Sequence, residues 1–172
     1  AHIAGLWAAL REGRDQAATA QVRERLGKLL SGSATLHVGG ATAAETEALG
    51  ARIAARLRPG DVVVLSGEVG AGKTTLIRGA CRQLGVEEPV TSPTFTIGQR
   101  YAGGRLPVSH LDLYRLESLA DEDPALLDDY LGGDGVAFVE WPAAGAERLG
   151  RPALEVRLRH EDPERRTVEI DW

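Results

Sequence analysis

The sequence predicts an α/β fold in which helices cover a mixed, mainly parallel sheet and an antiparallel strand pair ends the chain. Three observations support this prediction. An apolar, β-branched run over 61–66 leads through a glycine-rich turn into 75–84, where apolar residues recur at helical spacing. A second apolar run over 135–139 has the character of another inner strand. The alternating apolar residues of 154–158 and 168–170 flank a polar turn, which is typical of two paired strands.

The length of the chain predicts a single domain with an appendage. A chain of 172 residues with 43% hydrophobic residues is sufficient for one buried core. We place the domain at 33–172 and expect a helical N-terminal extension at 1–32. Its apolar spacing predicts two short amphipathic helices, which form either a partner-docking arm or an appendage packed on the domain. Because the chain begins at Ala1 and contains no methionine, we expect a processed product, a trimmed form or a fragment.

Charge and cysteine content narrow the expected partners and location. A net charge of −5 and a pI of about 5.4 argue against a broad nucleic-acid-binding surface on the chain. Contact with a nucleic acid through a partner protein is not excluded by this charge. The single cysteine, Cys81, cannot form an internal disulfide and is expected to be a small buried apolar residue. No apolar run approaches the length of a membrane span and no signal peptide is visible, so the expected location is cytoplasmic.

The first part of the domain predicts a strand followed by a helix. Residues 34–38 are the strand, which Gly39-Gly40 should close. Thr42 and Glu45 have the spacing of a capping box and mark the start of the helix. Pro59-Gly60 marks its end. The expected apolar face of this helix consists of Leu49, Ile53 and Leu57.

The turn that follows the 61–66 strand matches the phosphate-binding P-loop pattern G-x-x-x-x-G-K-[ST] in full, from Gly67 to Thr74. Its glycines let the backbone curl so that N–H groups point at an anion, and the helix N-terminus adds unpaired N–H groups and its dipole. Lys73 is one of only two lysines in the chain and stands where a compact ammonium suits a phosphate. The Thr74 hydroxyl is expected to ligate Mg²⁺. The sequence therefore predicts a P-loop NTPase-like three-layer sandwich with a nucleotide at the C-terminal strand edge.

The second half of the domain continues the alternation of strands and loops. Residues 89–94 predict a turn-rich loop, and 95–101 and 106–111 predict two strands around Gly103-Gly104. A loop and helix rich in acids then extend from 113 to about 130.

Two acids stand at the ends of apolar strands, where a nucleotide-hydrolysing site needs a carboxylate for Mg²⁺ and a group that places the nucleophile. Glu140 follows 136–139 in a pattern like a Walker B strand, and Asp112 follows 106–111. The alternative for each is a solvated strand-end acid. The chain contains no asparagine and so lacks the Asn-Lys-x-Asp motif with which GTPases read guanine, which favours ATP.

Four segments of the chain occur in the order and spacing of one family. They are the P-loop, Thr91-Ser92-Pro93-Thr94-Phe95, His110-Leu111-Asp112-Leu113-Tyr114-Arg115 and Val139-Glu140-Trp141-Pro142. Over roughly residues 36–170 the sequence resembles the TsaE (YjeE) ATPase family of bacterial tRNA threonylcarbamoyladenosine biosynthesis. The resemblance is specific, because P-loop proteins in general do not share the H-x-D-L-Y-R and E-W elements. It implies a weakly hydrolysing ATPase that acts as an accessory subunit with TsaB and TsaD, while the partner modifies A37 of the tRNA.

The same resemblance implies roles for individual residues. Lys73 would hold the phosphates, Thr74 and Glu140 would hold Mg²⁺, and Asp112 would act through Mg²⁺-bound or attacking water. Trp141 would buttress Glu140, and 91–94 resembles a switch-like segment near the γ-phosphate. The residues implied to lie at the nucleotide are Thr46, Glu68, Val69, Gly70, Ala71, Gly72, Lys73, Thr74, Thr75, Thr94 and Trp141.

Two other functions use the same P-loop. A small-molecule kinase needs an acceptor pocket and usually a lid that carries arginine residues. The segment 112–130 is a poor candidate for such a lid, because Arg115 is its single arginine and the segment is acidic. A non-enzymatic binding module, in which ATP merely orders the loop over 89–96, is the second alternative. Turnover of ATP with and without the partner subunits separates these possibilities.

Overall fold

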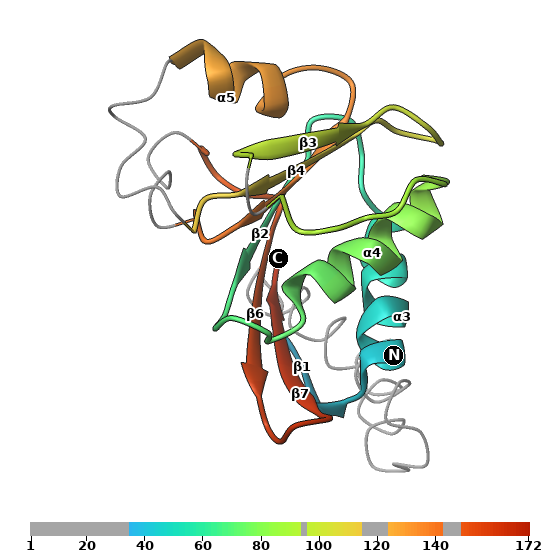
Figure 1. Cartoon of the computed structure of the whole chain (residues 1–172), viewed down its shortest axis with the longest axis vertical. Coiled ribbons are helices and arrows are strands. Elements are labelled where there is room, and N and C mark those ends of the chain that lie inside the picture. The colour runs from blue at the N-terminus through green and yellow to red at the C-terminus, as the bar shows by residue number, and fades with distance from the viewer. Residues whose placement is uncertain (1–34, 94–95, 115–123, 143–148) are drawn as a thin grey trace, which may run out of the picture.

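The computed structural model describes residues 35–93, 96–114, 124–142 and 149–172, so the helices expected within 1–32 lie outside the described residues. The described part forms one seven-stranded sheet with three α-helices packed on it (Figure 1). The strands are β1 (Thr35–Ala41), β2 (Val62–Ser66), β3 (Gly98–Tyr101), β4 (Val108–Asp112), β5 (Val136–Glu140), β6 (Leu154–His160) and β7 (Arg166–Asp171). The helices are α3 (Ala43–Ala54), α4 (Lys73–Leu84) and α5 (Pro124–Leu131).

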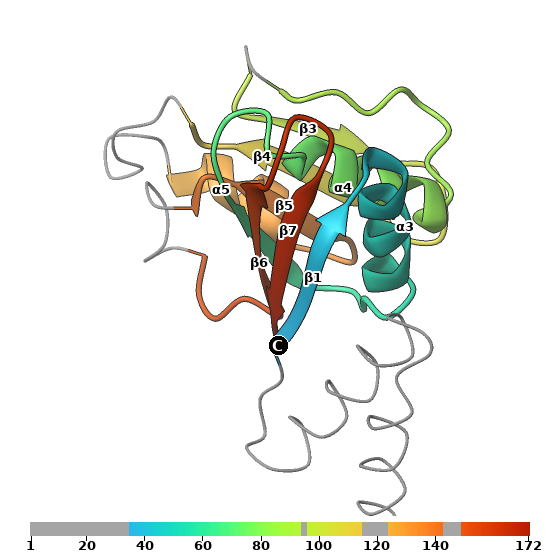
Figure 2. The same cartoon turned by 90° about the horizontal axis from the view of Figure 1, so that it is seen from below.

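The sheet is parallel at its centre and antiparallel toward both edges. Its strand order is β1-β7-β6-β2-β5-β4-β3, and β2 pairs in parallel with β5 and β6, as β4 does with β5. The pairs β1–β7, β6–β7 and β3–β4 are antiparallel, and Figure 2 shows β1, β7 and β6 side by side. The expected C-terminal pair is therefore confirmed. The expected predominance of parallel pairs is wrong, because β7 returns directly on β6 and a short hairpin turn permits only antiparallel pairing.

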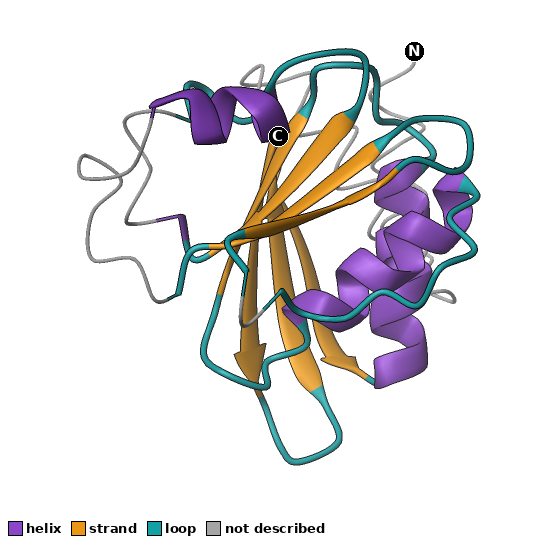
Figure 3. Cartoon of the chain, turned by 45° about the horizontal axis from the view of Figure 1, so that its top comes forward, coloured by secondary structure: helices purple, strands orange, loops and turns teal. Residues whose placement is uncertain are grey.

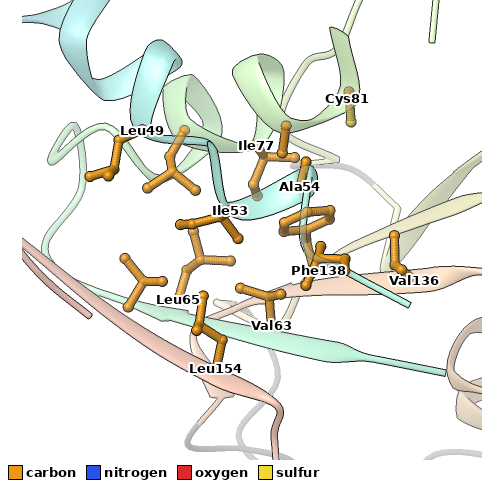
Figure 4. Close-up of a cluster of buried hydrophobic side chains, with 14 of the residues drawn as sticks. Leu49, Ile53, Ala54, Val63, Leu65, Ile77, Cys81, Val136, Phe138 and Leu154 are labelled. Atoms are coloured by element: carbon orange, nitrogen blue, oxygen red, sulfur yellow. The ribbon is translucent and has the colours of Figure 1, made fainter. Parts of the chain in front are cut away.

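Helices cover both faces of the sheet. In Figure 3, α3 and α4 lie together on one face, and α5 lies on the other. The larger buried cluster is formed between α3, α4 and the sheet (Figure 4), and a smaller one includes Leu127 of α5. Along β5, Val136 and Phe138 belong to the larger cluster, while Ala137 and Val139 belong to the smaller. Since side chains alternate along a strand, Glu140 lies on the same face as α4.

The two helices of the larger layer approach until their backbones touch. A Cβ atom at Gly50 would lie 1.9 Å from Leu76 O, and one at Gly79 would lie 1.9 Å from Glu47 O. Glycine is therefore required at both positions of this α3–α4 contact. The Glu47 carboxylate also pairs with Arg82 Nη1 at 2.5 Å. This close contact fixes α4, whose first turn carries the end of the P-loop.

Cys81 of α4 is fully buried, as expected from the sequence. Burial raises the pKa of its thiol to about 12. The residue therefore acts as a small apolar side chain in the layer between α4 and the sheet.

The predicted start of α3 is confirmed and two predicted element ends are wrong. Thr42 and Glu45 form the capping box with both reciprocal bonds. The first strand does not close at Gly39-Gly40 but continues to Ala41 through a register irregularity, where Gly40 N donates to Glu161 Oε2 at 2.7 Å. The helix ends at Ala54, earlier than expected, because Arg105 Nη2 from another loop donates to Ala54 O at 2.9 Å and caps this end.

The remaining elements follow the predicted order with shorter strands. The expected strand over 95–101 begins at Gly98, and residues 94–95 lie outside the described part. The expected strand over 106–111 is β4, which begins two residues later and ends at Asp112. Of the expected loop and helix from 113 to about 130, the structure describes Leu113, Tyr114 and α5, and residues 115–123 lie outside the described part. No helix among the described residues is both long enough and apolar enough to span a membrane.

Candidate functional site

The P-loop joins β2 to α4 in a backbone shape that depends on glycine. Gly67, Gly70 and Gly72 have φ values of 141°, 77° and 100°, in the region that side chains disfavour. A Cβ atom on Gly67 would lie 2.2 Å from Leu158 O, so this glycine also permits close contact with β6. Gly72 is the N-cap of α4 and offers no side-chain hydrogen bond to the first turn. The amides of this turn are therefore available to an anion, and the helix dipole favours negative charge there.

Glu68 attaches the P-loop to the end of β6. Its Oε1 accepts a hydrogen bond from His160 N at 3.1 Å, and His160 Nε2 lies 3.4 Å from Val69 O. Ala71 is fully buried, whereas the side chain of Val69 is 69% exposed at the rim of the loop. Contacts with the end of β6 thus hold the outer side of the loop. The glycine conformations set the direction of the amides on its inner side.

Lys73 is buried at the centre of the site. Its Nζ donates to Gly67 O at 2.8 Å and to Glu68 O at 3.0 Å, and the residue is only 5% exposed. Burial lowers the pKa of Lys73, and the negative charges of Glu140, Asp112 and Glu68 partly oppose this effect. The ring of Trp141 lies over the ammonium, with 4.1 Å between Nζ and the ring centroid. The lysine is therefore desolvated yet surrounded by groups that favour positive charge.

Glu140, at the end of β5, meets the first turn of α4. Its Oε1 accepts a hydrogen bond from the Thr74 hydroxyl at 2.9 Å. The same oxygen lies 2.9 Å from Nε2 of His110, and Glu140 is only 3% exposed. The fold thus brings the hydroxyl and the carboxylate predicted to share a metal into direct contact, although 66 residues separate them in sequence.

Asp112 ends β4 directly beside Glu140, with which it is in register in the parallel pair. Its Oδ2 accepts from the Ser92 hydroxyl at 2.7 Å, and its Oδ1 accepts from Tyr114 N at 3.1 Å. Ser92 belongs to the predicted 91–94 switch-like segment, so that segment is tied to the strand-end acid. Thr94, the predicted nucleotide contact in the same segment, lies outside the described residues.

Trp141 has an unusual backbone and an unexpected ring position. It has a positive φ of 58°, and its N–H donates to Leu65 O at 3.1 Å at the end of β2. Its ring packs against that of Tyr114 in a tilted arrangement, with 4.9 Å between centroids and 51° between the ring planes, and it covers Lys73. We expected Trp141 to buttress Glu140. That role stays a prediction, and the described hydrogen bonds to the Glu140 carboxylate come from Thr74 and His110.

Thr46 and Thr75 border the P-loop from the helices. The Thr46 hydroxyl donates to Thr42 O within α3 at 2.8 Å, and Thr46 Cγ2 lies 3.8 Å from the place of a Cβ on Gly72. Thr46 therefore adjoins the loop through its methyl group. Thr75 is half-buried in the first turn of α4. Both stay predicted nucleotide contacts.

The donors available to a metal ion are oxygen atoms. Thr74 offers a hydroxyl, and Glu140 and Asp112 offer carboxylates on neighbouring strands. Such hard donors suit Mg²⁺, which usually takes one or two protein carboxylates and completes its shell with phosphate oxygens and water. Among the residues the structure describes, no cluster of three or more His, Cys, Asp or Glu side chains is suited to hold a metal alone. The hydroxyl and carboxylate oxygens present are of the kind that Mg²⁺ prefers.

Sequence reasoning assigned no role to three residues of the site, although His110 and Tyr114 belong to the H-x-D-L-Y-R element. His110 contacts Glu140, His160 contacts the P-loop and Tyr114 packs against Trp141. One signal for His110 was present, because it stands two residues before Asp112 and strand alternation places both on one face. No comparable signal was present for His160, which reaches the P-loop only because β6 pairs with β2.

Comparisons with known proteins agree with this geometry. A family model described as "Threonylcarbamoyl adenosine biosynthesis protein TsaE" matches residues 40–168. The tRNA threonylcarbamoyladenosine biosynthesis protein TsaE of Bacillus subtilis is 42% identical over 125 residues, which cover 72% of this chain and 77% of that protein. The protein of the same name from Streptomyces coelicolor is 46% identical over 112 residues, covering 64% and 76%.

A solved structure has a similar fold. The crystal structure of Bacillus subtilis YdiB superposes with a TM-score of 0.68 at 32% identity, covering 81% of this chain and 86% of that one. The residues quoted in the sequence resemblance lie within the matched region. Among those that the structure describes, Thr74 of the P-loop contacts Glu140, and Ser92 contacts Asp112. The chain belongs to the TsaE family of threonylcarbamoyl adenosine biosynthesis proteins.

Proposed function

We propose that this chain binds ATP with Mg²⁺ in its P-loop and hydrolyses it weakly, as an accessory subunit in the formation of threonylcarbamoyladenosine on tRNA. The observation that carries the proposal is the 2.9 Å hydrogen bond between the Thr74 hydroxyl and Glu140 Oε1, at the end of a complete P-loop. With helices on both faces of a sheet whose central strands are parallel, we also infer a P-loop NTPase-type three-layer sandwich.

The residues divide the work between binding and hydrolysis. The amides of the P-loop and of the first turn of α4 would hold the phosphates, and Lys73 would exchange its two loop carbonyls for phosphate oxygens. A bound Mg²⁺ would neutralise charge that develops on the phosphates. Thr74 and Glu140 would hold the metal, and Asp112 would orient the attacking water. The Trp141 ring over Lys73 would limit the access of bulk water.

Membership of the family supports action with a partner. Val69 and Tyr114 are the large apolar side chains exposed in the described part, at 69% and 57%. A partner subunit that docks at the rim of the P-loop would cover Val69. We propose TsaB and TsaD as these partners. With a net charge of −5, the chain would meet tRNA through the complex rather than bind it alone.

Reconstitution tests the proposal. ATP turnover and threonylcarbamoyladenosine formation are measured with TsaB, TsaD and tRNA, with this chain present or absent. We expect the complex to turn over ATP only when this chain is present. We expect the Lys73→Ala variant of this chain to remove that turnover. Phosphorylation of an added nucleoside or other small acceptor would indicate a kinase instead. ATP binding without turnover in either setting would indicate a binding module.

A further inference from the structure

His110 is a buried histidine in which one of the two ring nitrogens has a hydrogen-bond partner among the described residues. It lies in β4 with no exposed surface, and its Nε2 is 2.9 Å from Glu140 Oε1. Its other ring nitrogen, Nδ1, is buried and has no hydrogen-bond partner among the described residues. Leaving such an atom unpaired costs free energy that an apolar residue at this position would avoid. The ring therefore needs an explanation other than packing.

The contact with Glu140 supplies that explanation. A carboxylate can only accept hydrogen bonds, so the ring nitrogen that faces it carries the hydrogen and donates. Thr74 donates to the same oxygen, so that two donors from two elements converge on Oε1. Within the described part of the chain, these two bonds are the side-chain hydrogen bonds of Glu140, and neither uses its other oxygen, Oε2. The arrangement holds one carboxylate oxygen in place and leaves the second available as a ligand.

We propose that His110 is a positioning residue for Glu140, which it orients toward the metal of a bound nucleotide through the Nε2–H bond. This inference rests on the proposed function and deepens it. Partners that orient a metal-binding carboxylate contribute to metal affinity without touching the metal. Three elements then set the geometry of one acid: β5 carries it, α4 supplies Thr74 and β4 supplies His110.

Two substitutions at His110 separate positioning from packing. His110→Gln keeps a side-chain N–H donor of similar reach, whereas His110→Leu removes the donor and keeps most of the volume. Ser109→Ala serves as a control on the same strand, because alternation turns this residue to the opposite face. Circular dichroism and thermal unfolding establish that each variant is folded.

The main measurement is metal binding, with Mn²⁺ as the probe in place of Mg²⁺. The affinity of each variant for Mn²⁺ in the presence of ADP is measured by electron paramagnetic resonance, and the affinity for ADP without metal is measured separately. We expect His110→Leu to weaken Mn²⁺ binding about tenfold and to leave metal-free ADP binding unchanged. The two other variants, His110→Gln and Ser109→Ala, should bind Mn²⁺ like the unsubstituted chain.

Three results would overturn the inference without touching the proposed function. Unchanged Mn²⁺ affinity in folded His110→Leu refutes it, as does an equal loss in His110→Gln and His110→Leu. Nitrogen NMR of the unsubstituted protein gives an independent readout should His110→Leu not fold, because a hydrogen on Nδ1 rather than Nε2 contradicts the proposed bond. If the unsubstituted chain binds no ADP, Mn²⁺–ADP or ATP, the proposed function itself fails and this inference with it. If the chain binds and hydrolyses ATP and His110→Leu leaves its Mn²⁺ affinity unchanged, the positioning role is refuted and the proposed function is retained.

Discussion

The P-loop and the ends of β4 and β5 form two sides of one site, and they are held by different kinds of contact. In the P-loop, positive φ values at Gly67, Gly70 and Gly72 shape the backbone, and the direction of its amides follows from that shape. At the strand ends, side chains set the geometry. Glu140 takes its hydrogen bonds from α4 and β4, and Asp112 takes one of its own from a serine in the 91–94 segment.

The two sides are therefore expected to respond differently to substitution. A change at Gly67 acts on the fold, because a Cβ atom there would clash with the backbone of β6. A change at a strand end acts on the orientation of one carboxylate and leaves the sheet intact. Four substitutions test this contrast, and they are given in order of decreasing effect.

The largest effect is expected from Gly67→Ala. The new Cβ would meet Leu158 O at 2.2 Å, at a φ of 141°. Backbone strain and this clash together should lower the free energy of unfolding by roughly 4 kcal/mol. Gly60→Ala is the control, because Gly60 also has a positive φ, of 85°, but a Cβ there meets nothing within 4 Å. Its cost should be about 1 kcal/mol. Urea unfolding of both variants gives the comparison, and equal losses would show that the contact with β6 does not constrain the loop.

Glu140→Ala should reduce ATP turnover and leave the fold and most of the ATP affinity intact. Loss of the acid beside Thr74 removes a group that holds the metal, which corresponds to about 3 kcal/mol, or roughly a 100-fold slower turnover. Phosphate release with the partner subunits and a nucleotide titration measure the two effects. Glu155→Ala on β6, a carboxylate paired with Arg157, is the control. Normal turnover by Glu140→Ala would refute the metal-site assignment.

Lys73→Ala should weaken ATP binding rather than the fold. The ammonium forms two hydrogen bonds with loop carbonyls and is expected to exchange them for phosphate oxygens. Losing a charge-assisted contact of about 2 kcal/mol should raise the dissociation constant roughly 30-fold. Arg78→Ala removes a positive charge from the same helix, where it pairs with Glu47, and should leave affinity unchanged. Calorimetric titration measures both, and an unchanged affinity of Lys73→Ala contradicts its phosphate role.

The smallest effect is expected from Thr42→Ala, which removes the N-cap of α3 beside the P-loop. Loss of this cap should cost about 1 kcal/mol in unfolding free energy, while Thr42→Ser should cost little. Hydrogen bonds from Thr42 lower the pKa of Glu45. The ionised carboxylate therefore stabilises the native state above its usual pKa, and this stabilisation is lost as the pH falls through the lowered native value. Thr42→Ala should show a weaker acid dependence in thermal unfolding, and an unchanged dependence would argue against the capping role.

Local sequence patterns were sufficient to predict the order of the helices and strands and to predict the P-loop side of the site. The P-loop, its strand and its helix were predictable because glycine, lysine and threonine act there through their own backbone and near neighbours. The capping box at Thr42 was predictable for the same reason. Element ends were less predictable where a distant residue decides them, as when Arg105 caps the end of α3.

The order of residues alone is enough to predict that a phosphate-binding loop follows a buried strand, and that two acids end two other strands. How these parts meet depends on the pairing of the strands in the folded chain. Sheet order puts β5 between β2 and β4, so that Glu140 reaches both Thr74 and His110, and it folds the Trp141 ring over Lys73. The physical reason is range: backbone conformation is set by neighbours in sequence, whereas the orientation of a buried side chain is set by whichever donors packing brings beside it.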